Sequence, residues 1–145
     1  MTIVNKVSPR ATFMGKLNHG SDLLEEITAL CRREDIRLGR LEALGAVQKA
    51  RLAFYDQQTR EYQFIILDQP LEITKLVGNV SLRDGIPFVH AHITLADRAG
   101  KAYGGHVAPG TTVFACEIIV EAFEGPVLER VFDEVTGLPL WVMPE

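Results

Sequence analysis

Cysteine is scarce in this sequence, and long apolar runs are absent. Only two of the 145 residues are cysteines, Cys31 and Cys116, and neither has the close spacing to another cysteine that zinc-binding motifs use. We therefore expect two buried thiols in a reducing compartment rather than a disulfide. No apolar stretch approaches the roughly 18 residues of a membrane-spanning helix, and the first residues lack the layout of a signal peptide. These absences predict a cytoplasmic protein that does not cross a membrane.

Basic residues are also too few to dominate the charge. Lys and Arg together number 15 against 19 Asp and Glu, and the formal net charge is −4. This balance argues against a protein that binds nucleic acid through its overall electrostatic field. A local basic patch stays open as an alternative, with Lys49 and Arg51 or Arg37 and Arg40 as its candidates. No aromatic residues alternate with a basic run, however, as single-strand binders often require.

Repeats, linkers and low-complexity tracts are absent as well, so nothing in the sequence divides the chain. A length of 145 residues fits one domain, which can bury a hydrophobic core without disulfides or structural zinc. The hydrophobic fraction of 47% and the charged fraction of 23% are ordinary for a soluble globular protein. We therefore expect a single domain.

One helix is predicted, close to the start of the chain. It begins at Ser21 or Asp22, because Asp22 followed by Glu25 fits a capping box. Apolar residues then recur at helical spacing from Leu23 to Cys31 and mark the buried side.

The rest of the chain shows strand patterns. The predicted strands are residues 10–17, 36–47, 49–56, 62–67, 71–82, 86–95, 112–123 and 128–134, with residues 136–141 closing the chain. We expect 112–123 to be the longest strand and, because it is almost continuously apolar, to be covered on both faces. The fold class is therefore α+β: one main α-helix packed on a mostly antiparallel β-sheet. The edge strands of such a sheet need cover, which favours association of subunits.

Three of the four histidines, His90, His92 and His106, fall close together in the chain. Residues 86–95 are rich in β-branched and aromatic side chains and form a predicted strand. His90 and His92 share one face of this strand, and the strand rise separates their Cβ atoms by roughly 6.5–7 Å. This separation lets both imidazole rings reach one cation.

His106 follows the glycine pair Gly104–Gly105. The pair either lets the backbone approach closely and deliver a third histidine, or forms a simple turn. Three histidines with an open fourth position are typical of catalytic zinc sites. The cluster of His90, His92 and His106 is thus the candidate metal site, and the expected cofactor is a divalent metal ion, with zinc as the first choice. The alternative is that the three are ordinary polar residues on a half-buried sheet face.

A metal held by three neutral histidines makes its bound water acidic or binds an anionic small molecule. Glu117, Glu42 and Thr94 are candidates to orient a ligand histidine or to act as a base, with ordinary polar strand residues as the alternative. Arg10 is a candidate partner for an anion or for a carboxylate of a neighbouring subunit, with a plain surface charge as the alternative. The sequence assigns no catalytic residue and leaves open whether the protein is an enzyme.

Four stretches, in order, resemble a known family. They are Arg10 with Leu17, Gly20, Asp22 and Leu23; residues 41–47 leading into 49–55; residues 71–80; and Asp84-Gly85, His90-Ala91-His92, Asp97, Gly100 and Gly104-Gly105-His106-Val107. The family is the plants-and-prokaryotes-conserved (PPC) domain, which is also found with AT-hook motifs in plant nuclear proteins. The resemblance covers residues 8–142, so we expect one PPC-like domain over this range, without a separate linker or second domain.

The resemblance implies an α+β domain with an antiparallel sheet that assembles as a homotrimer. In some stand-alone prokaryotic members histidines hold a metal ion, and these match His90, His92 and His106. Plant members bind A·T-rich DNA through AT-hooks, but this chain has no Arg-Gly-Arg-Pro core and no basic arm. The expectation is therefore a metal-binding homotrimer of unassigned activity. The alternative is a DNA-binding or transcription-associated interaction module without catalysis.

Overall fold

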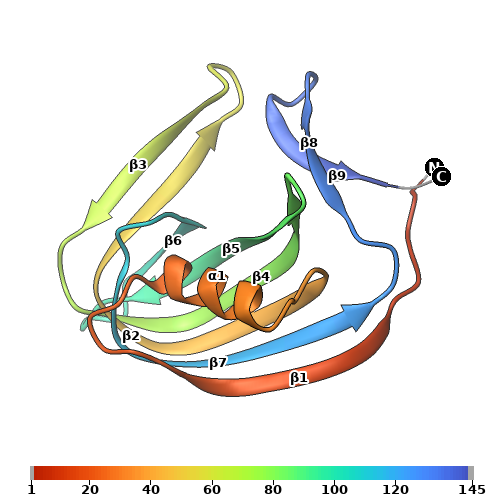
Figure 1. The fold of residues 1–145 in the computed structure, drawn as a ribbon. Helices are drawn as coiled ribbons and strands as arrows, with labels where there is room; N and C mark the ends of the chain where they lie inside the picture. Colours follow the sequence, from red (N-terminus) through yellow and green to blue (C-terminus); the bar gives the residue numbers. More distant parts are fainter. Residues whose placement is uncertain (1, 144–145) are drawn as a thin grey trace.

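One helix and nine strands make up residues 2–143, the part of the chain that the computed structural model describes (Figure 1). In chain order they are β1 (Ser8–Leu17), α1 (Leu23–Arg33), β2 (Gly39–Asp56), β3 (Glu61–Leu67), β4 (Leu71–Arg83), β5 (Ile86–Ala96), β6 (Ala102–Val107), β7 (Thr112–Glu124), β8 (Glu129–Asp133) and β9 (Leu138–Val142). The strands lie in the order β1-β7-β2-β6-β5-β4-β8-β9, with β3 paired to β2 and β4 also paired to β2. Apart from one parallel bridge between β4 and β8, the pairings are antiparallel. This confirms the predicted α+β class.

The helix α1 forms where the sequence predicts it and packs on one face of the sheet. Asp22 caps it, because its side chain accepts a hydrogen bond from the backbone N–H of Glu25. Leu23, Ile27 and Cys31 are buried and join the buried strand residues in one hydrophobic core. Figure 1 shows α1 in front of the sheet. At 11 residues it is too short to cross a membrane, and no other helix of the described residues is long and apolar enough to do so.

Both cysteines are buried and free, as expected from their spacing. Burial raises the pKa of the Cys31 thiol and of the Cys116 thiol to about 11 each. A thiol that stays protonated is a poor nucleophile and a poor metal ligand. The two cysteines therefore act as small core residues.

The strand β2 is continuous where the sequence predicts two strands. It has 18 residues and is longer than β7, which has 13, so the prediction that residues 112–123 form the longest strand was wrong. The predicted break after Val47 is instead a local irregularity. The pairing with β7 shifts register between Ala46 and Val47 and again between Val47 and Lys49. Such a bulge bends a strand without ending it.

The strand β6 closes a ring of pairings that the sequence pattern does not reveal. It pairs with β5 along its length and with β2 at Leu52 and Ala53. The strand β2 also pairs with β4, and β4 pairs with β5. The four pairings therefore close into a ring, β2-β6-β5-β4-β2. Residues 102–107 consequently lie beside β5 rather than in a loop.

The strand β7 is covered on one face only, which corrects the prediction of two covered faces. Val120 is fully buried, whereas Phe114 and Ile119 are 56% and 41% exposed. The uncovered surface continues across neighbouring strands. We call it the open face: the side of the sheet opposite α1, carrying the exposed apolar residues Met14, Leu44, Val77 and Ile119.

Two hairpins rise from the sheet on the same side in Figure 1, β2–β3 and β8–β9. They contact each other near their turns. The Tyr55 hydroxyl donates to the carbonyl oxygen of Thr136 at 2.7 Å, and the Arg60 guanidinium donates to that of Glu134 at 3.0 Å. The two hairpins thereby frame one end of the open face.

Candidate metal centre

The strand β5 carries His90 and His92 on the open face. Val89 and Ala91, which alternate with them, are buried, as the period of a strand predicts. His106 of β6 stands directly opposite His92 in the antiparallel pairing of β5 with β6. Side chains opposite each other in such a pair share a face and interact. All three predicted histidines are therefore brought together.

The ring nitrogens of the three histidines converge. One nitrogen of each ring lies within 4.8 Å of one nitrogen of each of the other two, and Nε2 of His90 is 3.2 Å from Nε2 of His92. The ring centroids are 5.0 to 5.4 Å apart. Two nitrogens bound to one tetrahedral zinc at 2.0–2.1 Å stand about 3.3 Å apart. The donor set therefore fits a three-histidine metal site.

Two of the imidazoles are held in the neutral form. Burial is the main cause that lowers the pKa of His90 to about 4, and the positive charges of His106, Arg130 and His92 add to it. Burial also lowers the pKa of His106, with further contributions from His92 and Arg130. A neutral imidazole offers the lone pair that a metal ion needs. At neutral pH a metal ion therefore meets little competition from protons at these two rings.

Gly104 and Gly105 allow β6 to lie close to its neighbours. A Cβ atom on Gly104 would stand 3.1 Å from the carbonyl oxygen of Ile93, and one on Gly105 would stand 3.1 Å from that of Ala53. Both glycines belong to the strand and not to a turn. Of the two interpretations of this pair, the structure supports the close backbone approach that delivers His106.

Arg130 and Tyr62 stand beside the histidines, although the sequence analysis does not identify them. The ring centroid of Tyr62, on β3, is 5.4 Å from that of His106. Arg130, on β8, donates from Nη2 to the side-chain oxygen of Asn79 at 2.9 Å, and Asn79 is the cross-strand partner of His90. Both residues come from hairpins remote in the sequence, and no spacing or motif links them to the histidines.

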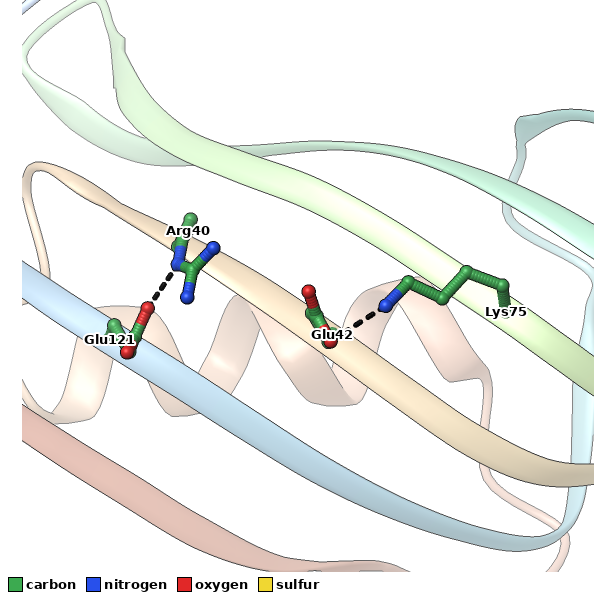
Figure 2. A network of polar contacts seen from close by, with 4 residues as sticks. All are labelled: Arg40, Glu42, Lys75 and Glu121. Carbon is green, nitrogen blue, oxygen red and sulfur yellow. Dashed lines mark hydrogen bonds and ion pairs between the residues drawn. The ribbon is translucent and has the colours of Figure 1, made fainter.

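Ion pairs engage Glu42 and Glu121 on the open face (Figure 2). Nζ of Lys75 is 2.7 Å from Oε2 of Glu42 and is the main cause that lowers the pKa of this carboxyl. Arg40 pairs with Glu121 across β2 and β7. The strand β4 lies between Glu42 and His92, so about two strand spacings, or roughly 10 Å, separate them. Glu42 is therefore not placed to orient a ligand histidine.

The other polar candidates do not hydrogen-bond to the histidines within residues 2–143. Glu117 lies on β7, with β2 and β4 between it and the cluster. Thr94 follows His92 on the open face of β5, but its side chain makes no hydrogen bond to the cluster. Arg10 donates to the carbonyl oxygens of Glu34 and Asp35 after α1, both at 3.3 Å. It therefore binds backbone of its own chain.

Three of the four basic candidates are also engaged within the chain, whereas Lys49 is exposed and has no side-chain hydrogen bond or ion pair within residues 2–143. Arg37 is 3.9 Å from a carboxylate oxygen of Asp35, and Arg40 is paired as described above. The Arg51 guanidinium lies 3.8 Å from the ring centroid of Phe64. Arg37, Arg40 and Arg51 thus each contact a different partner within the chain.

A sequence model of the Plants and Prokaryotes Conserved (PCC) domain matches residues 5–124. The chain belongs to this family. The match confirms the resemblance found in the sequence and includes β1 to β7 with all three histidines. The β8–β9 hairpin of this PCC domain, with Arg130, lies beyond the matched residues.

Solved structures share the PCC fold. A metal-containing protein from Archaeoglobus fulgidus is 40% identical, with a TM-score of 0.92 over 97% of this chain and 99% of that one. A plant- and prokaryote-conserved (PPC) protein from Pyrococcus horikoshii is 31% identical, with a TM-score of 0.92 over 99% of both chains. A protein from Ralstonia eutropha JMP134 described as a candidate DNA-binding protein is 26% identical, with a TM-score of 0.81 over 90% of both chains.

Curated relatives extend the comparison to longer proteins. The bifunctional protein GlmU of Synechococcus sp. strain JA-2-3B'a(2-13) is 33% identical over 143 residues, which cover 89% of this chain and 21% of that protein. GlmU of Synechococcus sp. strain JA-3-3Ab is 35% identical over 108 residues, or 16% of its length. The chain thus spans about a fifth of the length of these relatives or less. The likeness therefore concerns only that part of each relative.

Proposed function

We propose that this PCC-domain protein binds one divalent metal ion per chain through His90, His92 and His106, with zinc as the expected ion. The observation that carries the proposal is the convergence of one nitrogen from each ring within 4.8 Å. The neutral state of His90 and His106 at pH 7 supports it, because protons do not compete with the metal there. The 40% identical protein from Archaeoglobus fulgidus, named as metal-containing, supports it further.

A three-histidine site leaves the charge of the ion uncompensated. Imidazole ligands carry no negative charge, and a fourth position stays open for water or another ligand. A metal in this position acidifies bound water or attracts an anion. We assign ligand binding at this position and no particular reaction.

The functional unit in this proposal is a homotrimer located in the cytoplasm. The open face supports assembly, because Met14, Leu44, Val77 and Ile119 are each at least 41% exposed in the single chain. Exposed apolar surface of this extent marks an interface more often than free surface. Two buried free thiols are consistent with a reducing compartment.

The metal content of protein purified without a histidine tag tests the proposal. We expect about one zinc or similar ion per chain in the wild type, and loss of the ion in His92→Ala because two ligands do not hold it. His19→Ala is the matched control, since His19 contacts Phe114 and lies outside the cluster. An absence of metal in the wild type, together with no uptake from added zinc, would refute the site.

DNA binding is the alternative function, and the name of the Ralstonia eutropha protein is the observation in its favour. The net charge of −4 and the internal partners of Arg37, Arg40 and Arg51 make it the weaker candidate. Genuine binding requires an affinity that falls steeply with salt, because neutralised phosphates release counterions. A salt titration of binding to an A·T-rich duplex distinguishes this function from the metal site.

A further inference from the structure

We infer that Arg130 and the open metal position together form a binding site for a small molecule that carries an oxyanion, either a carboxylate or a phosphate group. One oxygen of the group occupies the fourth metal position, and the neighbouring oxygen accepts hydrogen bonds from the guanidinium. The inference rests on the proposed metal site and adds its ligand class.

The guanidinium of Arg130 is held in a fixed orientation. Nε donates to the Ser81 hydroxyl at 2.8 Å, Nη1 to the carbonyl oxygen of Pro139 at 3.2 Å, and Nη2 to Asn79 at 2.9 Å. Two aromatic rings lie nearby, with Cζ 5.4 Å from the centroid of Phe88 and 5.5 Å from that of Trp141. A group fixed in this way loses little conformational freedom when it binds a ligand.

Two hydrogen-bond donors of Arg130 have no acceptor among residues 2–143. A guanidinium has five N–H groups, one on Nε and two on each Nη nitrogen. The three hydrogen bonds above use one from each nitrogen. The remaining two sit on different Nη nitrogens, so each can donate to one oxygen of a carboxylate or phosphate group. Lysine offers no equivalent planar fork.

The positive charge of Arg130 also has no counter-ion within the described part of the chain, residues 2–143. The side chain is half-buried, and no carboxylate among residues 2–143 comes within 4 Å of it. Its partners are a hydroxyl, an amide oxygen and a carbonyl oxygen, all neutral. Arg83 adds a second cation nearby, with Cζ 5.8 Å from the ring centroid of Phe88. A partly buried charge without a partner is costly, and an anionic ligand relieves this cost.

The guanidinium and the histidines are adjacent on the open face. Asn79, which binds Nη2, is the cross-strand partner of His90, and Ser81, which binds Nε, is the partner of Phe88. Opposed side chains of an antiparallel pair lie about 5 Å apart. Arg130 is therefore bound to the residue of β4 that stands directly opposite His90 on the open face.

Cobalt(II) substitution tests the inference, because the visible spectrum of cobalt reports a ligand at the open position. The probes are acetate, inorganic phosphate and thiocyanate, titrated into cobalt-loaded wild type. The variants are Arg130→Gln, which removes charge and donors, and Arg130→Lys, which keeps the charge without the fork. Arg98→Gln is the matched control, since it removes the same charge from an exposed turn.

We expect acetate or phosphate to bind the wild type and Arg98→Gln equally, and Arg130→Gln at least about tenfold more weakly, as for the loss of a charge-assisted hydrogen bond. Arg130→Lys should weaken the binding of acetate and phosphate but leave the affinity for thiocyanate within about threefold of the wild-type value. Whichever of acetate and phosphate binds more tightly shows whether the site prefers a carboxylate or a phosphate group. Cobalt stoichiometry and thermal unfolding, measured on each variant, exclude a merely structural effect.

Three results overturn the inference in distinguishable ways. Equal oxyanion affinities in wild type and Arg130→Gln, with cobalt bound to both, remove Arg130 from the site and leave the metal proposal intact. Failure of the wild type to take up cobalt removes the metal proposal itself. If the Arg130 variants unfold, side-chain nitrogen NMR of the zinc-loaded wild type decides: unchanged Arg130 signals on addition of phosphate refute the contact.

Discussion

At the scale of single residues, His90 shows how burial keeps a candidate metal ligand unprotonated. It shares the open face with His92, yet it is half-buried, and burial is the main reason that its pKa falls to about 4. An ordinary histidine is partly protonated near pH 6.5. Below that pH the unfolded chain binds a proton at this residue that the folded chain does not bind.

The stability of the metal-free protein should consequently depend on pH between about 4 and 6.5. Because the folded-state pKa of His90 lies below the unfolded value, the free energy of unfolding is highest above pH 6.5 and falls as the pH drops toward 4. In His90→Gln this part of the slope should disappear. Urea unfolding in the presence of a chelator at pH 4.5, 5.5, 6.5 and 7.5 measures it, and parallel curves for the two proteins would contradict the prediction.

At the scale of elements, β2 depends on a glycine to stay continuous. Gly45 has a φ of +140° and lies where the register of β2 against β4 shifts. A Cβ atom there would stand 2.1 Å from the carbonyl oxygen of Ala115 and 2.9 Å from Cα of Cys116. Bulges of this kind bend a strand and increase its twist. The bend precedes the part of β2 that pairs with β3 and β6, and so helps to position His106.

Gly45→Ala should therefore destabilise the fold strongly. Both the unfavourable φ and the backbone overlap act against it, and we expect a loss of about 3 kcal/mol in the free energy of unfolding. Gly15→Ala is the control, because no atom lies within 4 Å of the place that an added methyl group would take on β1, and alanine is favoured over glycine within a strand. Urea unfolding of both variants measures the difference. A loss below about 1 kcal/mol for Gly45→Ala would show that β2 tolerates a shift here.

At the scale of the whole molecule, the open face is a surface that no other element of the described chain covers. It carries exposed apolar residues and the ion pairs Glu42–Lys75 and Arg40–Glu121, which Figure 2 shows. A groove of about 760 Å³ lies there, lined by residues of β1, β2, β4 and β7. Identical copies are the occupants that the homotrimer proposal requires. Residues 8–142 remain our proposed extent of the domain, which includes the β8–β9 hairpin beyond the family match.

Leu44→Asp should dissociate the trimer. Leu44 is 56% exposed in the single chain. A carboxylate at this position therefore costs little folding stability, but it opposes association if a second chain buries it. Light scattering coupled to size exclusion should give three times the chain mass of 16.1 kDa for the wild type and one chain for the variant. Val135→Asp, at a site 81% exposed in the β8–β9 turn, should stay trimeric. A monomeric wild type would refute the assembly, and a trimeric Leu44→Asp would place the interface elsewhere.

Local patterns in the sequence determined the elements whose signals are contained within a few residues. The capping residue Asp22 and the apolar spacing after it predict α1, because a helix is specified by contacts three and four residues apart. Alternation along residues 86–95 places His90 and His92 on one face, because the period of a strand is two. His106 could be named as the third candidate because it follows the same strand after a glycine pair, but its convergence with the other two depends on the pairing of β6 with β5.

Tertiary structure alone decided which strands meet, because pairing between distant segments depends on register and burial across the whole sheet. The short segment Ala102–Val107 contains two glycines, which weaken any strand signal, and becomes β6 only through β5 and β2. The sequence offers Glu42 and Glu117 as candidates to orient a ligand histidine, but in the fold other strands separate them from the histidine cluster. Arg130 arrives beside His90 from the far end of the chain, since β8 docks on β4, and no local pattern encodes that contact.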